Sequence, residues 1–208
     1  MTTMTHQYLA TMFYSKKTID KVLSKNIIVE ASGITDTSKI KFRKYTTSIY
    51  RNKYDKEILT KDKGNDLYKV IKVSGKGYQG FLVAIYDPSR VGIATTAYLG
   101  KRGEDILTVS RREKAIISMN AGGFYDPDWN SNGALPHGTV ISRGKVVSDY
   151  EDARVGGGFI GFDKDNKLVL GSMSKSEAVK RGLRDAIEFG PFLIINGKRS
   201  FIKGNGGW

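Results

Sequence analysis

The placement of glycine constrains the fold of this chain more than any other feature. The 208 residues include 24 glycines, and many of these stand beside runs of β-branched and aromatic residues. Glycine permits the tight turns that join short strands, and the flanking runs favour strand structure. Beyond Leu67 the runs are interrupted by Gly-Lys-Gly, Arg-Gly-Lys and Asn-Gly, a pattern typical of antiparallel neighbours. We therefore expect an α+β fold, with a mostly antiparallel, twisted sheet and a few short helices.

The sequence divides into an N-terminal part, 1–66, and a strand-rich domain, 67–208. In the first part, apolar residues at helical spacing predict one short amphipathic helix that begins at Ser15 or Lys16. The polar sequence over 30–65 predicts irregular structure. The strands of the domain are expected in three β-rich runs over 67–96, in hairpins over 138–149 and 157–171, and in a last apolar strand over 190–202.

Two helices are predicted between these strands. The first covers 104–112 and leads into a buried strand at 115–119. The second begins at Ser174, where a glutamate three residues later has capping-box spacing, and extends through 187. Gly182 weakens the middle of that second helix.

Charge narrows the classes of partner. The formal net charge of +13 attracts nucleic acid, anionic lipid or an anionic cell-wall polymer. The basic residues are spread along the chain and do not gather with stacking aromatics, which disfavours specific nucleic-acid binding. The absence of cysteine excludes a disulfide scaffold and a thiolate metal site. We find no apolar run of about 18 residues and no secretion leader, so we expect any such segment outside these residues.

The most polar stretch is "NAGGFYDPDWNSNGALPHG", residues 120–138. We expect it to follow a buried strand, with Gly122 and Gly123 letting the backbone approach a ligand closely. His137, between a proline and a glycine, is suited to act as an acid, a base or a hydrogen-bond donor. An ordinary surface loop that uses the same residues to make turns is the competing interpretation.

Part of this loop matches a calcium-binding pattern. Asp128, Asn130 and Asn132 alternate and precede a glycine, as in the first half of an EF-hand loop. The twelfth position is Thr139 in place of the bidentate glutamate, which excludes an EF-hand and leaves open a looser, oxygen-ligated calcium site. No other cofactor and no other metal is expected.

Other candidates lie outside the loop. Glu188 precedes Gly190-Pro191 at the entrance to a strand, where burial would suit it to act as a general acid. A cluster of carboxylates follows the 138–149 hairpin and fits either acid-base chemistry or a solvated turn; its members are Asp149, Glu151 and Asp152. The Gly-Gly-Gly-Phe run at 156–159 predicts a bend or bulge.

Three motifs follow one another along the chain: "MNAGGFYDP", "HGTVISRGKVVSD" and "FGPFLIINGK". In this order they resemble the phosphodiester glycosidase domain, which occurs in the lysosomal uncovering enzyme and in bacterial exopolysaccharide-related proteins. The resemblance runs from about Leu67 to Trp208. Family domains continue into a Pro-Arg-Thr and an Asp-Gly-Gly-x-Ser segment, neither of which is present here, so we expect a fragment that lacks the C-terminal part and whose activity is in doubt.

The resemblance implies hydrolysis of a sugar-1-phosphodiester, with basic groups around the phosphate and one acid or base. It also implies a bacterial cell-surface or extracellular location, an exopolysaccharide-related or cell-surface glycan as substrate, and a parent protein anchored in the membrane through a segment missing here. A non-catalytic domain that binds anionic wall polymer or polysaccharide is the alternative. We expect catalysis by Asp126, His137 and Glu188, substrate binding by Asn120, Gly122, Gly123, Phe124, Arg143 and Gly190, and phosphate contacts from Arg143, Lys145 and Arg154.

Overall fold

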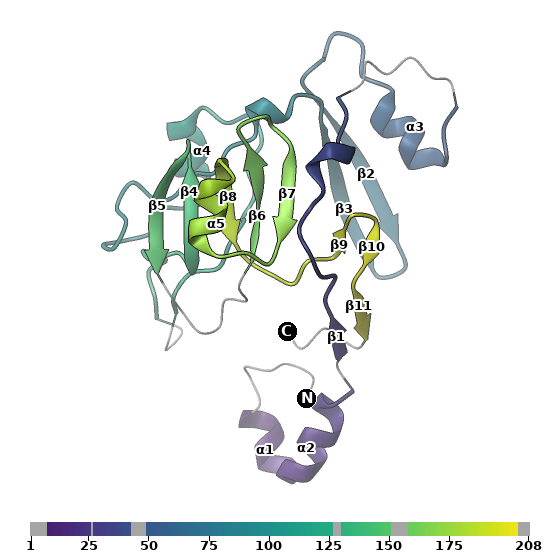
Figure 1. Ribbon diagram of the computed structural model, residues 1–208. Coiled ribbons are helices and arrows are strands. Elements are labelled where there is room, and N and C mark those ends of the chain that lie inside the picture. The colour runs from purple at the N-terminus through teal and green to yellow at the C-terminus, as the bar shows by residue number, and fades with distance from the viewer. Residues whose placement is uncertain (1–7, 26, 43–48, 127–129, 151–157, 204–208) are drawn as a thin grey trace.

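A five-stranded antiparallel sheet with strand order β5-β4-β8-β6-β7 forms the centre of the molecule in the computed structural model (Figure 1). The structure describes residues 8–25, 27–42, 49–126, 130–150 and 158–203. The expected α+β fold, with mostly antiparallel strands and a few short helices, is confirmed. The strands of this sheet are β4 (Gly138–Ser142), β5 (Lys145–Tyr150), β6 (Phe159–Asp163), β7 (Leu168–Gly171) and β8 (Leu183–Glu188).

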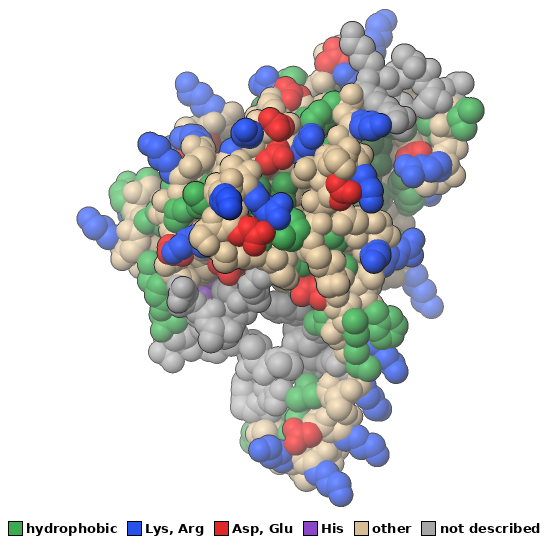
Figure 2. Space-filling view, in the orientation of Figure 1, with side chains coloured by type: hydrophobic (Ala, Val, Ile, Leu, Met, Phe, Trp, Pro, Cys, Tyr) green, Lys and Arg blue, Asp and Glu red, His purple; other side chains and the backbone are tan. Residues whose placement is uncertain are grey.

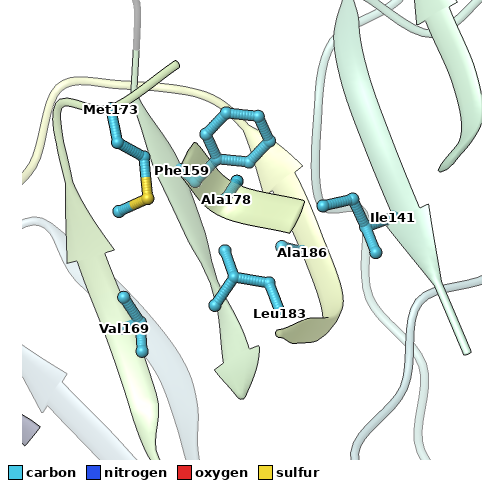
Figure 3. Packing of buried hydrophobic residues seen from close by; sticks show 7 residues of the cluster. All are labelled: Ile141, Phe159, Val169, Met173, Ala178, Leu183 and Ala186. Carbon is cyan, nitrogen blue, oxygen red and sulfur yellow. The ribbon is translucent and has the colours of Figure 1, made fainter. Parts of the chain in front are cut away.

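The main hydrophobic core lies between this sheet and helix α5 (Lys175–Lys180), which crosses one of its faces (Figure 3). Phe159 and Ile141 have exposed fractions of 0% and 1%, and the burial of each contributes about 1.5–3 kcal/mol. Their neighbours in the core are Val169, Met173, Ala178, Leu183 and Ala186.

Local turn chemistry sets the two predicted hairpins of the sheet, and both are confirmed. Between β4 and β5, Arg143 and Gly144 have φ values of 51° and 74°, the left-handed pair that a two-residue hairpin turn requires. Between β6 and β7, Asn166 takes φ 61°, and the carboxylate of Asp163 accepts hydrogen bonds from two amides of the turn.

Three smaller pairs of strands lie on the β7 side of the central sheet (Figure 1). The hairpin of β2 and β3 follows the expected pattern, and the Asn-Gly turn joins β9 to β10 as predicted. The third pair, β1 with β11, joins the two ends of the chain. Their bounds are β1 (Ile27–Val29), β2 (Tyr68–Gly75), β3 (Tyr78–Ile85), β9 (Ile194–Ile195), β10 (Lys198–Arg199) and β11 (Phe201–Lys203).

The N-terminal part is more regular than its composition predicts. The helix α2 (Lys16–Leu23) begins as expected, with Ser15 as its N-cap. The sequence also forms α1 (Tyr8–Phe13), η1 (Thr37–Lys39) and α3 (Lys53–Leu59). No helix of the described residues has the length and apolar character needed to cross a bilayer.

Residues 34–35 cover one edge of the central sheet. Ile34 forms a bridge with Gly171, the amide of Thr35 donates to the Leu170 carbonyl at 2.8 Å, and the Leu170 amide donates to Thr35 Oγ1 at 2.9 Å. These bonds satisfy backbone groups that an edge strand would otherwise expose.

The predicted helix over 174–187 is wrong beyond its first turns. It ends at α5, because Gly182 takes φ 73° and reverses the chain, and the residues after it form β8, the central strand of the sheet. Leu183 and Ala186 are buried on that strand. Tertiary burial therefore overrides a local apolar spacing that also fits a helix.

The buried strand predicted at 115–119 is also wrong. Helix α4 (Ile106–Glu113) forms close to its predicted position, but Lys114 then takes a left-handed conformation, and residues 115–119 lie exposed outside any strand.

The third β-rich run predicted within 67–96 is not a strand either. Between η2 (Pro88–Arg90) and Thr96, it is held by the Ile93 amide, which donates to Asp185, and by the Ile93 carbonyl, which accepts from Ser142.

Candidate active site at the loop end of the sheet

The polar loop folds back on itself directly before β4. The Tyr125 amide donates to the Leu135 carbonyl at 2.8 Å, and the His137 amide donates to the Gly123 carbonyl at 2.9 Å. A bridge joins Phe124 to Pro136 between them. The two limbs of the loop are therefore fixed against each other at the point where the central sheet begins.

Several polar side chains of this loop hold its shape. Asp126 accepts a hydrogen bond from the Ser131 amide at 2.8 Å. Asn132 donates to the Lys101 carbonyl and accepts from the Ala134 amide. These bonds favour the turn-forming interpretation for Asp126 and Asn132, whereas Asn120 and Asn130 are exposed. Asp128 lies outside the described residues, and the calcium site stays a prediction.

His137 lies at the base of the loop among aromatic rings. Its ring is 6.3 Å from that of Tyr125 in an edge-to-face arrangement, and Tyr125 is 5.0 Å from Tyr150 of β5. A Cβ atom on Gly123 would come within 3.1 Å of His137 Cδ2 and 3.6 Å of the Phe189 ring. A side chain at this position would press on the imidazole, so the close approach at Gly123 is to His137 of the protein itself, not to a ligand as expected.

Two carboxylates flank Thr139 in the same part of the sheet. Thr139 is buried, and its hydroxyl donates to Asp149 on β5 at 2.9 Å. Its amide donates to Glu188 at the end of β8 at 3.0 Å. Lys175, the first residue of α5, forms an ion pair with the other oxygen of Asp149. Thr139 thus joins the ion-paired Asp149 carboxylate to the Glu188 carboxylate.

The environment of Asp149 keeps it ionised. The hydrogen bond from Lys175 lowers the pKa of this carboxyl below its usual value, and the bond from Thr139 acts in the same direction, against the opposing effect of burial. The lowered pKa makes the Asp149 carboxylate a weaker proton acceptor, and its two oxygens already accept hydrogen bonds from Thr139 and Lys175.

The ion pair between Lys175 and Asp149 should make the free energy of unfolding depend on pH in the acidic range. Because the pKa of Asp149 is lower in the folded state, the pair stabilises the protein above the unfolded carboxyl pKa of about 3.9 and loses this effect as pH falls through the lowered value. Lys175→Met should reduce the free energy of unfolding at pH 7 by about 0.2–1 kcal/mol, because the pair is partly exposed. Urea unfolding at pH 7 and pH 3 measures this difference, which should shrink at the lower pH. Lys180→Met on the same helix is the control, and an equal effect from it would refute the assignment.

Arg143 is separated from this cluster. It lies in the turn at the far end of β4, about 17 Å from Gly138 along an extended strand, and it forms an ion pair with Glu113 of α4. Lys145 begins β5 beside it. Three further candidates, Glu151, Asp152 and Arg154, lie outside the described residues.

The other expected binding residues lie around the loop end. A Cβ atom on Gly122 would lie 3.8 Å from Ile187 of β8, and Phe124 is 46% exposed. Gly190 precedes Pro191 through a cis peptide bond, next to the Glu30 carboxylate that accepts from the Phe192 amide. The structure thus brings Gly122, Gly123, Phe124, His137 and Glu188 to one end of the sheet.

Sequence reasoning missed Thr139, Lys175, Tyr125 and Tyr150. The register of the hairpin contains a signal for two of them, because a turn at Arg143 and Gly144 with one bulge pairs Thr139 with Asp149 and Gly138 with Tyr150. The contact of Lys175 has no such local signal.

A cavity of about 300 Å³ lies elsewhere, at the β7 edge, and none of the candidate site residues lines it. Its lining residues are Thr35, Asp36, Lys39, Ile40, Leu168, Leu170, Ile194 and Asn196.

Comparison with known proteins agrees with the motifs. Residues 113–208 match the family model described as phosphodiester glycosidase, so the expected resemblance is confirmed for this part of the chain. The matched part includes the polar loop and all five strands of the central sheet. No curated protein matches the chain.

Proposed function

We propose that this chain, whose residues 113–208 match the phosphodiester glycosidases, hydrolyses a sugar-1-phosphodiester. The family name itself points to a glycosidase in general. The observation that carries the finer proposal is the position of Glu188, Thr139 and Asp149 at the loop end of the sheet, inside the matched part.

The chemistry of the reaction fits such a set of groups. Water attacks the anomeric carbon, the bond from that carbon to the phosphate oxygen breaks, and a phosphate monoester leaves as a stable anion. Because the leaving group needs little protonation, one base that takes a proton from water is sufficient. We assign this role to Glu188, with His137 at the base of the polar loop as a donor to the substrate.

The other groups of the site suit a sugar phosphate. The rings of Tyr125 and Tyr150 provide a face on which a sugar ring stacks, and the Asp149 carboxylate accepts from sugar hydroxyls. Lys175 places a half-exposed cation beside that carboxylate for the phosphate oxygens. The substrate is proposed to be an exopolysaccharide-related or other bacterial cell-surface glycan, met outside the cell by a parent protein anchored in the membrane.

A non-catalytic role in binding anionic wall polymer is the second candidate. It is favoured by the positions of Asp126 and Asn132, whose side chains hold the loop and leave few free groups for catalysis. Lys and Arg are also scattered over the visible face in Figure 2 and form no single stripe, which suits diffuse attraction to a polyanion better than specific nucleic-acid binding.

Hydrolysis of a methyl ester of a sugar-1-phosphate, measured as release of free sugar, tests the proposed function. His137→Ala should lower kcat/KM at least about tenfold, because it removes a donor at the loop end. Arg143→Ala, at the far end of β4, should leave it nearly unchanged. Binding of the ester without turnover would favour the second candidate, and a larger loss in the Arg143 variant would move the site to the other end of the sheet.

A further inference from the structure

The N-terminal helix pair exposes an apolar stripe. Leu9, Met12 and Phe13 of α1 have the spacing i, i+3, i+4, which places them on one helix face, and their exposed fractions are 55%, 71% and 77%. Ala10 of α1 and Ile19 of α2 are buried, and the two helices pack against each other. The stripe is therefore an exposed face of a packed pair of helices.

The same pair of helices carries several exposed lysines. Residues 8–25 contain four lysines and one aspartate, and all five of these side chains are exposed. Figure 1 places α1 and α2 apart from the central sheet, and Figure 2 shows Lys and Arg side chains around the tip that they form. The lysines are Lys16, Lys17, Lys21 and Lys25.

We propose that the pair α1–α2 docks on an anionic lipid bilayer. Leu9, Met12 and Phe13 enter the boundary between headgroups and acyl chains, and the lysines contact the lipid phosphates. The helices lie on the surface and do not cross it.

Other occupants fit these side chains less well. A second copy of the chain would bring two sets of lysines together, and like charges in contact oppose association. A polysaccharide or wall polymer satisfies the lysines but gives no apolar surface to Leu9, Met12 and Phe13. A bilayer of anionic lipid supplies both kinds of contact, since apolar burial and charge attraction add in interfacial helices.

Sedimentation of the full chain with vesicles tests this proposal. The chain should bind vesicles of phosphatidylcholine with phosphatidylglycerol and bind pure phosphatidylcholine weakly. Phe13→Ser should weaken binding by at least about tenfold, because it removes a large apolar contact. Phe81→Ser, which changes a 72% exposed ring of β3, is the matched control and should have little effect.

Paired lysine variants separate local contact from the overall charge. Lys16→Gln with Lys17→Gln should weaken binding to the anionic vesicles by about tenfold or more. Lys164→Gln with Lys180→Gln removes the same charge from exposed positions of the sheet domain and should weaken it much less. Circular dichroism of each variant shows whether the fold is kept.

Three results would overturn the proposal. Equal binding by the Phe13 and Phe81 variants would show that the stripe does not insert. Equal losses in the two lysine pairs would reduce the binding to diffuse attraction. A dimer in analytical ultracentrifugation that dissociates on Phe13→Ser would assign the stripe to a second copy of the chain.

Discussion

Glu188→Gln is expected to lower the hydrolysis of a sugar-1-phosphodiester by at least about 100-fold, the usual contribution of a general acid or base. The amide oxygen of glutamine still accepts the hydrogen bond that the Thr139 amide now donates to Glu188 at 3.0 Å. The substitution therefore keeps the hydrogen bond between β4 and residue 188 of β8 and removes only the ability of this side chain to take up a proton. Steady-state kinetics with the methyl ester measures the effect.

Two further variants separate catalysis from structure. Glu188→Ala leaves the Thr139 amide, on a buried residue, without its acceptor and should cost about 1–3 kcal/mol of stability, a loss that Glu188→Gln should largely avoid. Glu177→Gln is the control on α5, where the carboxylate pairs with Arg181. Full activity in Glu188→Gln, with reduced stability in Glu188→Ala, would show that Glu188 only holds β4 and β8 together. Its assignment as the general base would then be refuted.

The hairpins of the fold could be predicted because their information is local. A left-handed pair at Arg143 and Gly144 fixes the β4–β5 turn, and the strands beside it follow from the alternation of apolar residues. The start of α2 at Ser15 is local in the same way, since the hydroxyl that caps it is in the adjacent residue.

Errors arose where burial depends on distant segments. Leu183 and Ile187 are four residues apart and fit a helix, yet they belong to the central strand, whose neighbours β4 and β6 come from far along the chain. The opposite error occurred at 115–119, where an apolar run lies exposed and Met119 is 83% accessible. Hydrophobicity alone does not tell which apolar runs the fold covers.

In the candidate site, too, local features could be predicted from the sequence, and contacts between distant residues could not. The glycine-flanked loop and His137 were identified from composition, and Gly123 does allow a close approach. The contact between Thr139 and Glu188 joins residues 49 positions apart, so no local pattern contains it. The Asp126 side chain accepts from the Ser131 amide and Asn120 is exposed, and the catalytic role of Asp126 and the binding role of Asn120 stay predictions.

Gly161→Ala should destabilise the protein by about 3 kcal/mol or more, because the central strands leave no space for a methyl group. A Cβ atom at Gly161 of β6 would lie 2.2 Å from the Asp185 carbonyl oxygen and 2.3 Å from Ala186 Cβ, both on β8. Ala186 is fully buried, and β8 is held on its other side by β4, so the strand has no free direction in which to move.

Gly80→Ala in β3 is the matched control for this effect. Its Cβ atom would lie 3.8 Å from Val73 Cγ2, an ordinary van der Waals contact, and its backbone needs no glycine conformation. Alanine there restricts the unfolded chain and should be neutral or slightly stabilising. Thermal unfolding compares the two: for a chain of this size a loss of 3 kcal/mol lowers Tm by about 6–12 °C. Equal Tm values for both variants would mean that β6 and β8 do not approach as closely at Gly161 as the register requires, and the pairing that places Glu188 opposite Phe159 would have to be revised with it.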